Sequence, residues 1–171
     1  IKMKINRPFK LEFLTLKTNN FKDKKKAILQ ELKKYPEKRF HNFFSNRDKT
    51  GLADVVANIF QEEFLQISEH YKSNLDLYSS WSATYGKGDY HVPHNHGSTG
   101  YCGILYLNMH KKSPTTCYMQ PWNSDSDKSI LYEPKAEEDD IVIVPQFIVH
   151  FTRPNLVPFK KRIISFDFRL Q

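Results

Sequence analysis

The chain has 171 residues, enough for one domain with a hydrophobic core and too few for two ordinary domains. Aromatic residues make up 14% of it, which argues against disorder, and a mean hydropathy of -0.62 without a long apolar run argues against a membrane span. The net charge of +7 is uneven: residues 1–50 hold 15 Lys and Arg against 5 Asp and Glu, and residues 51–171 hold 11 against 14. A solvated helix face explains this basic first third better than a surface for nucleic acid, although both readings stay open.

Two further features bear on the compartment. The sequence does not open with a basic and then apolar leader that ends in a small-residue cleavage site, so we expect a cytoplasmic location. The two cysteines, Cys102 and Cys117, fall in neighbouring predicted strands, where a disulfide is geometrically conceivable. In a reducing compartment we expect two buried free thiols instead.

The first third of the chain and the residues just after it are predicted to be mainly helical. Residues 5–16 predict an edge strand or an extended lead-in. Apolar residues at helical spacing predict a basic amphipathic helix over 21–35, ended by a proline, and residues 37–50 predict a flexible loop. Thr50 is then expected to cap a second, longer helix that continues to about residue 71.

After residue 74 the period changes from helical to alternating, and short apolar runs recur between Gly, Pro, Asn and Ser. The predicted strands are 75–85, 101–108, 115–120, 140–144 and 162–170. Regular short strands of this kind indicate an antiparallel sandwich or barrel. We therefore expect an α+β fold in a single domain, with a helical and basic lead-in over 1–74 and an all-β core over 75–171.

A histidine cluster is the most informative motif, because His91, His94 and His96 lie within six residues. Side chains two apart in an extended segment point to the same face, so His94 and His96 predict a two-ligand metal clamp. His91 is one position outside this pattern, and we expect it beside the site or at the surface. The alternative is a polar loop in which the imidazoles only form hydrogen bonds.

A third ligand is needed, and His150 is the best candidate because it follows the predicted strand 140–144. Its apolar neighbours Val149 and Phe151 are also compatible with a buried structural histidine. A close pair on one strand and a distant histidine on another place three ligands on one side of a metal. The open side would then accept substrate.

The run YGKGDYHVPHNH, from Tyr85 to His96, resembles the tyrosine, glycine, tyrosine, His-x-Asp pattern of the iron(II)- and 2-oxoglutarate-dependent oxygenases. The likeness is greatest to the prolyl-hydroxylase-like branch and to bacterial and phage members whose motif reads His-x-His. Segment 101–108, DDIVIVPQFIVHFTRPN and KRIISFDFRL are similar to the strands that follow in this family. The resemblance covers about residues 81–170.

This resemblance implies a double-stranded β-helix, or jelly-roll, with Fe(II) held by His94, His96 and His150. It also implies that Arg162 binds the distal carboxylate of 2-oxoglutarate, with Arg153 as the substitute, and that Tyr85 contacts the cosubstrate. The implied reaction uses molecular oxygen and couples decarboxylation of 2-oxoglutarate to succinate with oxidation, as a hydroxylase, of an unidentified substrate. That substrate would be a protein side chain or a small molecule.

His96 departs from the family pattern, which has Asp or Glu at this position, so the metal and the reaction stay open. A cupin-type three-histidine dioxygenase is the nearest alternative, although residues 97–101 lack the glutamate that its motif expects. A zinc hydrolase would need a general base, and Asp89 is the only carboxylate close in sequence. The remaining alternative is a non-enzymatic β-sandwich module with a metal site.

Overall fold

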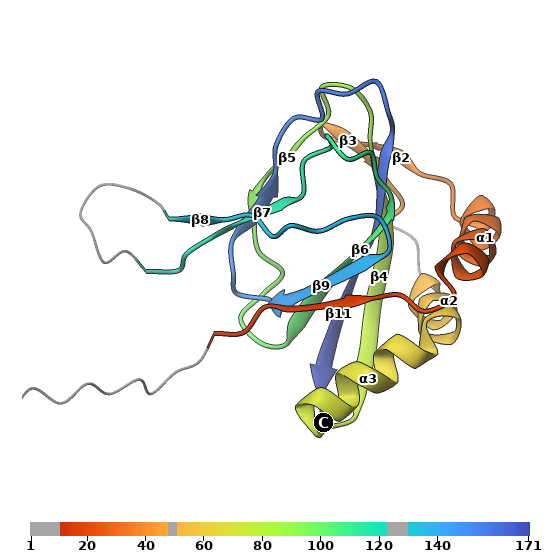
Figure 1. The fold of residues 1–171 in the computed structure, drawn as a ribbon, viewed down its shortest axis with the longest axis vertical. Helices are drawn as coiled ribbons and strands as arrows, with labels where there is room; N and C mark the ends of the chain where they lie inside the picture. Colours follow the sequence, from red (N-terminus) through yellow and green to blue (C-terminus); the bar gives the residue numbers. More distant parts are fainter. Residues whose placement is uncertain (1–10, 48–50, 123–129) are drawn as a thin grey trace, which may run out of the picture.

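The computed structural model describes residues 11–47, 51–122 and 130–171, which form a pair of facing antiparallel sheets covered by helices (Figure 1). The larger sheet has seven strands in the order β1-β9-β6-β11-β4-β3-β2, and the smaller has four in the order β5-β10-β7-β8. The strands of the larger sheet are β1 (Leu14–Lys17), β2 (Lys38–Phe40), β3 (Phe43–Ser45), β4 (Leu75–Tyr85), β6 (Tyr101–Asn108), β9 (Asp140–Pro145) and β11 (Lys161–Leu170). The strands of the smaller sheet are β5 (His91–His94), β7 (Thr116–Met119), β8 (Leu131–Tyr132) and β10 (His150–Thr152).

Strict alternation in the central strands of the larger sheet builds two cores, one on each face. In β9, Ile141 and Ile143 face the helices, whereas Val142 and Val144 face the smaller sheet. The same division holds in β6 and β11, because successive side chains in a strand point to opposite faces. Residue parity along a strand therefore decides which side chains can reach the space between the sheets.

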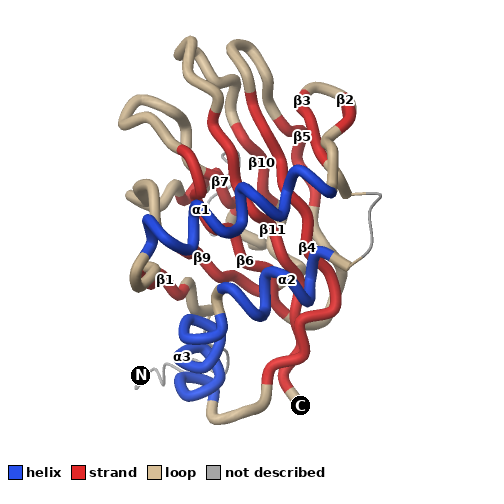
Figure 2. The backbone as a smooth tube through the Cα atoms, turned by 90° about the vertical axis from the view of Figure 1, so that its right-hand side faces the viewer, coloured by secondary structure: helices blue, strands red, loops and turns tan. Residues whose placement is uncertain are grey.

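The helices cover the outer face of the larger sheet, as Figure 2 shows for α1 (Phe21–Glu31) and α2 (Leu52–Ile59). A short 3-10 turn, η1 (Leu32–Lys34), extends α1, so the helix predicted over 21–35 is confirmed. The second predicted helix is instead two helices, α2 and α3 (Gln61–Tyr71). The chain leaves helical geometry at Phe60 (φ -108, ψ 29), whose buried ring packs into the helix-side core. The predicted cap, Thr50, lies outside the described residues.

Five strands predicted after residue 74 are present with nearly the predicted bounds, and the α+β jelly-roll class is confirmed. The expectation of a flexible loop over 37–50 is wrong for residues 38–45, which contain β2 and β3. Phe43 and Ser45 face inward, and the Ser45 hydroxyl donates to the Ser82 carbonyl 2.9 Å away. This hairpin escaped prediction because its strands have three residues each, too few to show a period.

Some lysines of the basic first third form ion pairs within the protein. Lys24 forms ion pairs with Glu62 and Glu63 at 2.9 and 2.8 Å, and the Glu63 side chain is fully buried. Lys25 reaches Glu138 at 2.6 Å. These contacts fasten α1 to α3 and to the segment before β9, so these two lysines stabilise the fold.

Both cysteines are free and buried, which confirms the expectation of two thiols. Burial raises the pKa of Cys117 and that of Cys102 above their usual range, so both are held as thiols. Among the described helices, none has the length and apolar character needed to cross a membrane.

Gly103 is a position where a side chain would not fit. It lies opposite Phe166 across β6 and β11, and a Cβ atom there would fall 2.1 Å from the Phe166 ring. We expect Gly103→Ala to displace this ring from its edge-to-face contact with Phe64 and to lower the free energy of unfolding by about 1–3 kcal/mol. Urea denaturation measures the change, and an unaltered midpoint would show that the sheet accommodates the methyl group.

Candidate active site

The three predicted ligands meet between the sheets. His94 ends β5 and His150 begins β10, and these two residues are direct partners in the antiparallel pair. His96 follows two residues after His94, and its amide donates to the Gln146 carbonyl at 3.1 Å. One nitrogen from each of the three rings lies within 4.8 Å of the others. A small inward rotation of the rings would therefore bring three nitrogens to bonding distance of one ion.

Each of these rings has its Nδ1 atom engaged by a fixed acceptor. The Nδ1 of His94 lies 2.9 Å from the Val92 carbonyl, and that of His150 lies 2.9 Å from the Ile148 carbonyl. A carbonyl oxygen only accepts, so Nδ1 carries the proton and Nε2 keeps its lone pair. The backbone thereby selects the tautomer that a metal requires before any metal arrives.

Burial keeps two of these rings neutral. Desolvation lowers the pKa of His94 to about 4 and that of His150 to about 3, and the neighbouring histidines add to the effect. At pH 7 both rings are uncharged, which is the form that binds a metal.

Asp167 contacts the third ring and was not anticipated from the sequence. Its Oδ1 lies 2.6 Å from Nδ1 of His96, and the side chains are 9% and 2% exposed. A carboxylate that accepts the Nδ1 proton orients an imidazole and makes its Nε2 a stronger donor to a metal. Of the three rings, His96 is thus the one bonded to a charged acceptor.

The cation that faces this interior is Lys161, not Arg162. Lys161 shares its face of β11 with Ile163 and Ser165, which line the small cavity beside the histidines. Its side chain is completely buried, its Nζ donates to the Pro114 carbonyl at 2.7 Å, and Nζ lies 5.1 Å from the Tyr85 ring centroid. Within the described chain no carboxylate pairs with it, and burial lowers its pKa to about 7.

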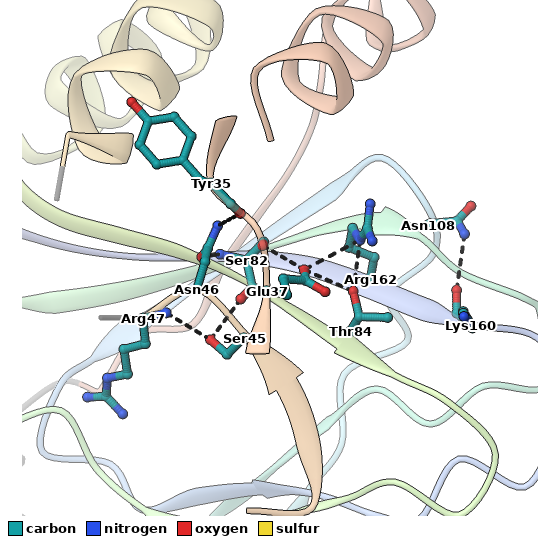
Figure 3. Close-up of polar contacts among 10 residues, drawn as sticks. All are labelled: Tyr35, Glu37, Ser45, Asn46, Arg47, Ser82, Thr84, Asn108, Lys160 and Arg162. Carbon is teal, nitrogen blue, oxygen red and sulfur yellow. Dashed lines mark hydrogen bonds and ion pairs between the residues drawn. The ribbon is translucent and has the colours of Figure 1, made fainter. Parts of the chain in front are cut away.

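Arg162 lies on the opposite face of β11, toward the helices (Figure 3). Its Nε donates to the Thr84 hydroxyl at 2.8 Å and lies 3.6 Å from the Glu37 carboxylate. Arg153 is also directed elsewhere, since it is half exposed and lies 3.5 Å from Glu133. The structure therefore brings neither arginine to the histidines.

Two buried hydroxyls lie in this region. Thr116 lines the histidine cavity, and the Tyr118 ring centroid lies 5.6 Å from that of His150. The two hydroxyls are close enough to interact with each other. The cavity has about 20 Å³ of free volume, so lining side chains must move to admit a ligand.

Tyr85, expected to contact the cosubstrate, lies in this cavity between the histidines and Lys161 and stacks on Phe43 at 5.0 Å. His91 is beside the site, with its ring centroid 3.9 Å from that of His94. Asp89 lines a different cavity and forms an ion pair with Arg39 at 2.8 Å. A hydrolase base at Asp89 therefore has no access to the histidines.

Comparison with known proteins gives a fold and no sequence relative. No protein-family model and no curated protein matches the sequence. Among solved structures, a 2-oxoglutarate/Fe(II) oxygenase family oxidoreductase from Burkholderia pseudomallei is similar, with a TM-score of 0.71 and 8% identity over 92% of this chain and 84% of that one. The chain has the fold of these oxygenases.

Two further neighbours extend the comparison. HygX from Streptomyces hygroscopicus, solved with nickel, 2-oxoglutarate and hygromycin B, has a TM-score of 0.66 and 13% identity over 92% of this chain and 82% of that chain. A prolyl-4-hydroxylase from Pseudomonas putida has a TM-score of 0.62 and 12% identity over 93% and 92%. Neighbours with this fold thus include a protein that binds nickel, 2-oxoglutarate and hygromycin B and a prolyl hydroxylase.

Proposed function

We propose that this protein is an Fe(II)- and 2-oxoglutarate-dependent oxygenase that acts as a hydroxylase. The observation that carries the proposal is Lys161, a fully buried ammonium without an acidic partner in the described chain, on the same face of β11 as the histidine cavity. A buried cation of this kind is stable when an anion joins it. A dicarboxylate with one end on a metal and the other on Lys161 meets this requirement.

His94, His96 and His150 are the proposed metal ligands, each through Nε2. They occupy one side of the ion and leave the other side to the cosubstrate and oxygen. The family has a carboxylate ligand where this chain has His96. We propose that Asp167 compensates for its absence, because its carboxylate contacts the Nδ1 of the His96 ring instead of the metal. The negative charge is therefore kept close to the ion.

Lys161 is proposed to hold the distal carboxylate of 2-oxoglutarate. It precedes the cavity-lining Ser165 by four residues, about 13 Å along the strand. An extended lysine side chain and a five-carbon dicarboxylate together span such a distance. The Thr116 hydroxyl, which lines the histidine cavity, is proposed to donate to the same ligand, and the Tyr85 ring lies beside it.

When bound, Fe(II) and 2-oxoglutarate activate oxygen and yield succinate, carbon dioxide and an oxidised substrate. The chain's own share is to position these groups and to exclude water, which Trp81, Ile104 and Ile163 do at the cavity wall. The neighbours act on or bind an aminoglycoside in one case and prolyl residues in the other, so we leave the substrate as a protein side chain or a small molecule.

Anaerobic titration of the apo protein with Fe(II) and then 2-oxoglutarate tests the proposal. We expect the visible charge-transfer band of a chelated keto acid to appear with both additions and with neither alone. Metal binding without this band would instead favour a cupin-type three-histidine dioxygenase. Tight zinc binding that Fe(II) cannot displace would contradict the oxygenase.

The affinity for 2-oxoglutarate should depend on pH through Lys161. The groups facing its ammonium are the rings of Tyr85 and Tyr106 and, at longer range, Glu133, whose charge favours the protonated form. Because its pKa is about 7, the ammonium is lost as pH rises above 7. We expect the apparent Kd to increase about tenfold per pH unit there, with uptake of a proton on binding. Calorimetry of the Ni(II)-loaded protein at pH 6.5 and 8.5 measures both, and a flat profile would contradict it.

A further inference from the structure

A cavity with a volume of about 530 Å³ lies on the outer face of the seven-stranded sheet, away from the histidines. It is lined by the end of α1, the segment before β2, and strands β3, β4 and β11. This volume is within the range of small-molecule sites. The metal-side cavity is far smaller, so the outer cavity has room for a ligand without rearrangement.

Arg162 forms the floor of this cavity and is held in place from one side. Figure 3 shows Glu37 between Ser82, Thr84 and Arg162. Glu37 accepts from the hydroxyls of Ser82 at 2.7 Å and Thr84 at 3.0 Å, and Arg162 uses only its Nε toward this pair. Its two terminal nitrogens have no hydrogen-bond partner within the described residues. The guanidinium is thus pre-positioned with a free two-nitrogen edge, the geometry that binds a carboxylate or phosphate.

The remaining charges of the lining favour an anion. Asp89 is neutralised by Arg39 at 2.8 Å, and Glu37 is offset by Arg162. Lys33 and Lys160 also line the cavity, are exposed, and form no ion pair within the described residues. The cavity therefore carries an excess of two positive charges once its internal pairs are counted.

Apolar side chains complete the lining. Leu29, Leu32, Pro36 and Phe44 contribute them, and Phe44 is an exposed aromatic residue with 42% of its surface accessible. A bare inorganic anion would leave these side chains in contact with water. The lining matches a ligand with an anionic group at one end and an apolar body at the other.

We propose that this outer cavity binds a small organic anion, a carboxylate or phosphate monoester with an apolar body, through Arg162, Lys33 and Lys160. The site is separate from the proposed oxygenase centre and does not depend on it.

Alternate residues of β4 and β11 line the outer cavity and the metal-side cavity. Arg162 pairs with Thr84 across β11 and β4, and the next pair in register is Lys161 with Tyr85. Successive residues of both strands thus serve the outer cavity and the metal-side cavity in turn.

Titration of the ¹⁵N-labelled apo protein with benzoate, phenyl phosphate and inorganic phosphate, followed by NMR, tests the proposal. We expect saturable shifts at Lys33, Thr84 and Arg162 with benzoate or phenyl phosphate, and weaker shifts with inorganic phosphate. Which head group binds more tightly identifies the ligand class. Arg162→Gln should weaken binding at least tenfold, whereas the matched control Arg153→Gln on the other sheet should not change it.

Two further variants secure the interpretation. Lys160→Gln removes an exposed rim charge without touching the Glu37 network, and we expect a two- to fivefold loss of affinity with unchanged stability. Lys161→Met should leave probe binding intact. Absence of saturable shifts with every probe, or binding that survives Arg162→Gln and disappears in Lys161→Met, would overturn the proposal, because the probe would then occupy the inner site.

Discussion

Lys161→Met should lose 2-oxoglutarate and gain stability at the same time. Without the ammonium, the distal carboxylate is buried unpaired, which costs about 3–5 kcal/mol and weakens binding roughly 10²- to 10⁴-fold. In the apo protein the same substitution removes a buried charge that has no anionic partner in the described chain. We expect the free energy of unfolding at pH 7 to rise by about 1–3 kcal/mol.

The pH dependence of this gain distinguishes it from better packing. The pKa of Lys161 is about 7 in the folded chain against an ordinary value of 10.5, so the charge penalty is fully present below pH 7 and disappears as pH rises toward 10.5. The difference in stability between the variant and the native protein should shrink across this window. Denaturation at several pH values measures the difference in stability, and calorimetry measures the affinity for 2-oxoglutarate.

Arg162→Gln is the matched control, one residue away on the other face of β11. It should leave the Kd for 2-oxoglutarate within about twofold of the native value. Loss of cosubstrate binding in Arg162→Gln together with normal binding in Lys161→Met would show that Arg162, and not Lys161, binds the cosubstrate.

Asp167→Asn should weaken metal binding about 10- to 100-fold while leaving the fold intact. The amide oxygen still accepts from Nδ1 of His96, so the ring keeps its orientation and its tautomer. What disappears is the negative charge that strengthens Nε2 as a ligand. Titration of the apo protein with Co(II), followed by its visible absorption in the absence of 2-oxoglutarate, measures the change.

Asp140→Asn serves as the control, because Asp140 is a buried carboxylate of the same sheet that accepts a hydrogen bond from the Glu137 amide and does not line the histidine cavity. Its metal affinity should equal that of the native protein. Equal affinities in all three proteins would reduce Asp167 to a structural residue. Absence of Co(II) binding in the native protein would count against the metal centre itself.

Burial on both faces made the central strands predictable from the sequence. The strands that carry Ile104, Val142 and Ile164 are nearly continuous apolar runs between polar or turn residues, so their bounds could be read almost directly. The His94, His96 and His150 group could also be predicted, because a pair at even spacing needs only an extended segment to share a face.

The basic residue opposite the histidines could not be fixed in the same way. Lys160, Lys161 and Arg162 stand together at the start of β11, and which of them points inward depends on strand parity, not on charge. We expected Arg162 because guanidinium matches a carboxylate, and the structure instead buries Lys161 on the face of β11 that looks toward the histidines. Asp167 was missed for a different reason: a long-range contact between a loop and a distant strand leaves no local pattern.

The backbone carbonyls of Val92 and Ile148 hold the rings of His94 and His150. These metal ligands and the cosubstrate-binding Lys161 respond differently to pH. His94 and His150 are already deprotonated at Nε2 far below neutral pH, so loading them with metal displaces no proton from either ring between pH 6 and 8. Lys161 gains and loses its proton within that same interval. A rise in pH would therefore weaken the binding of 2-oxoglutarate while the metal stays bound. A later fall in pH would restore cosubstrate binding without reloading the metal.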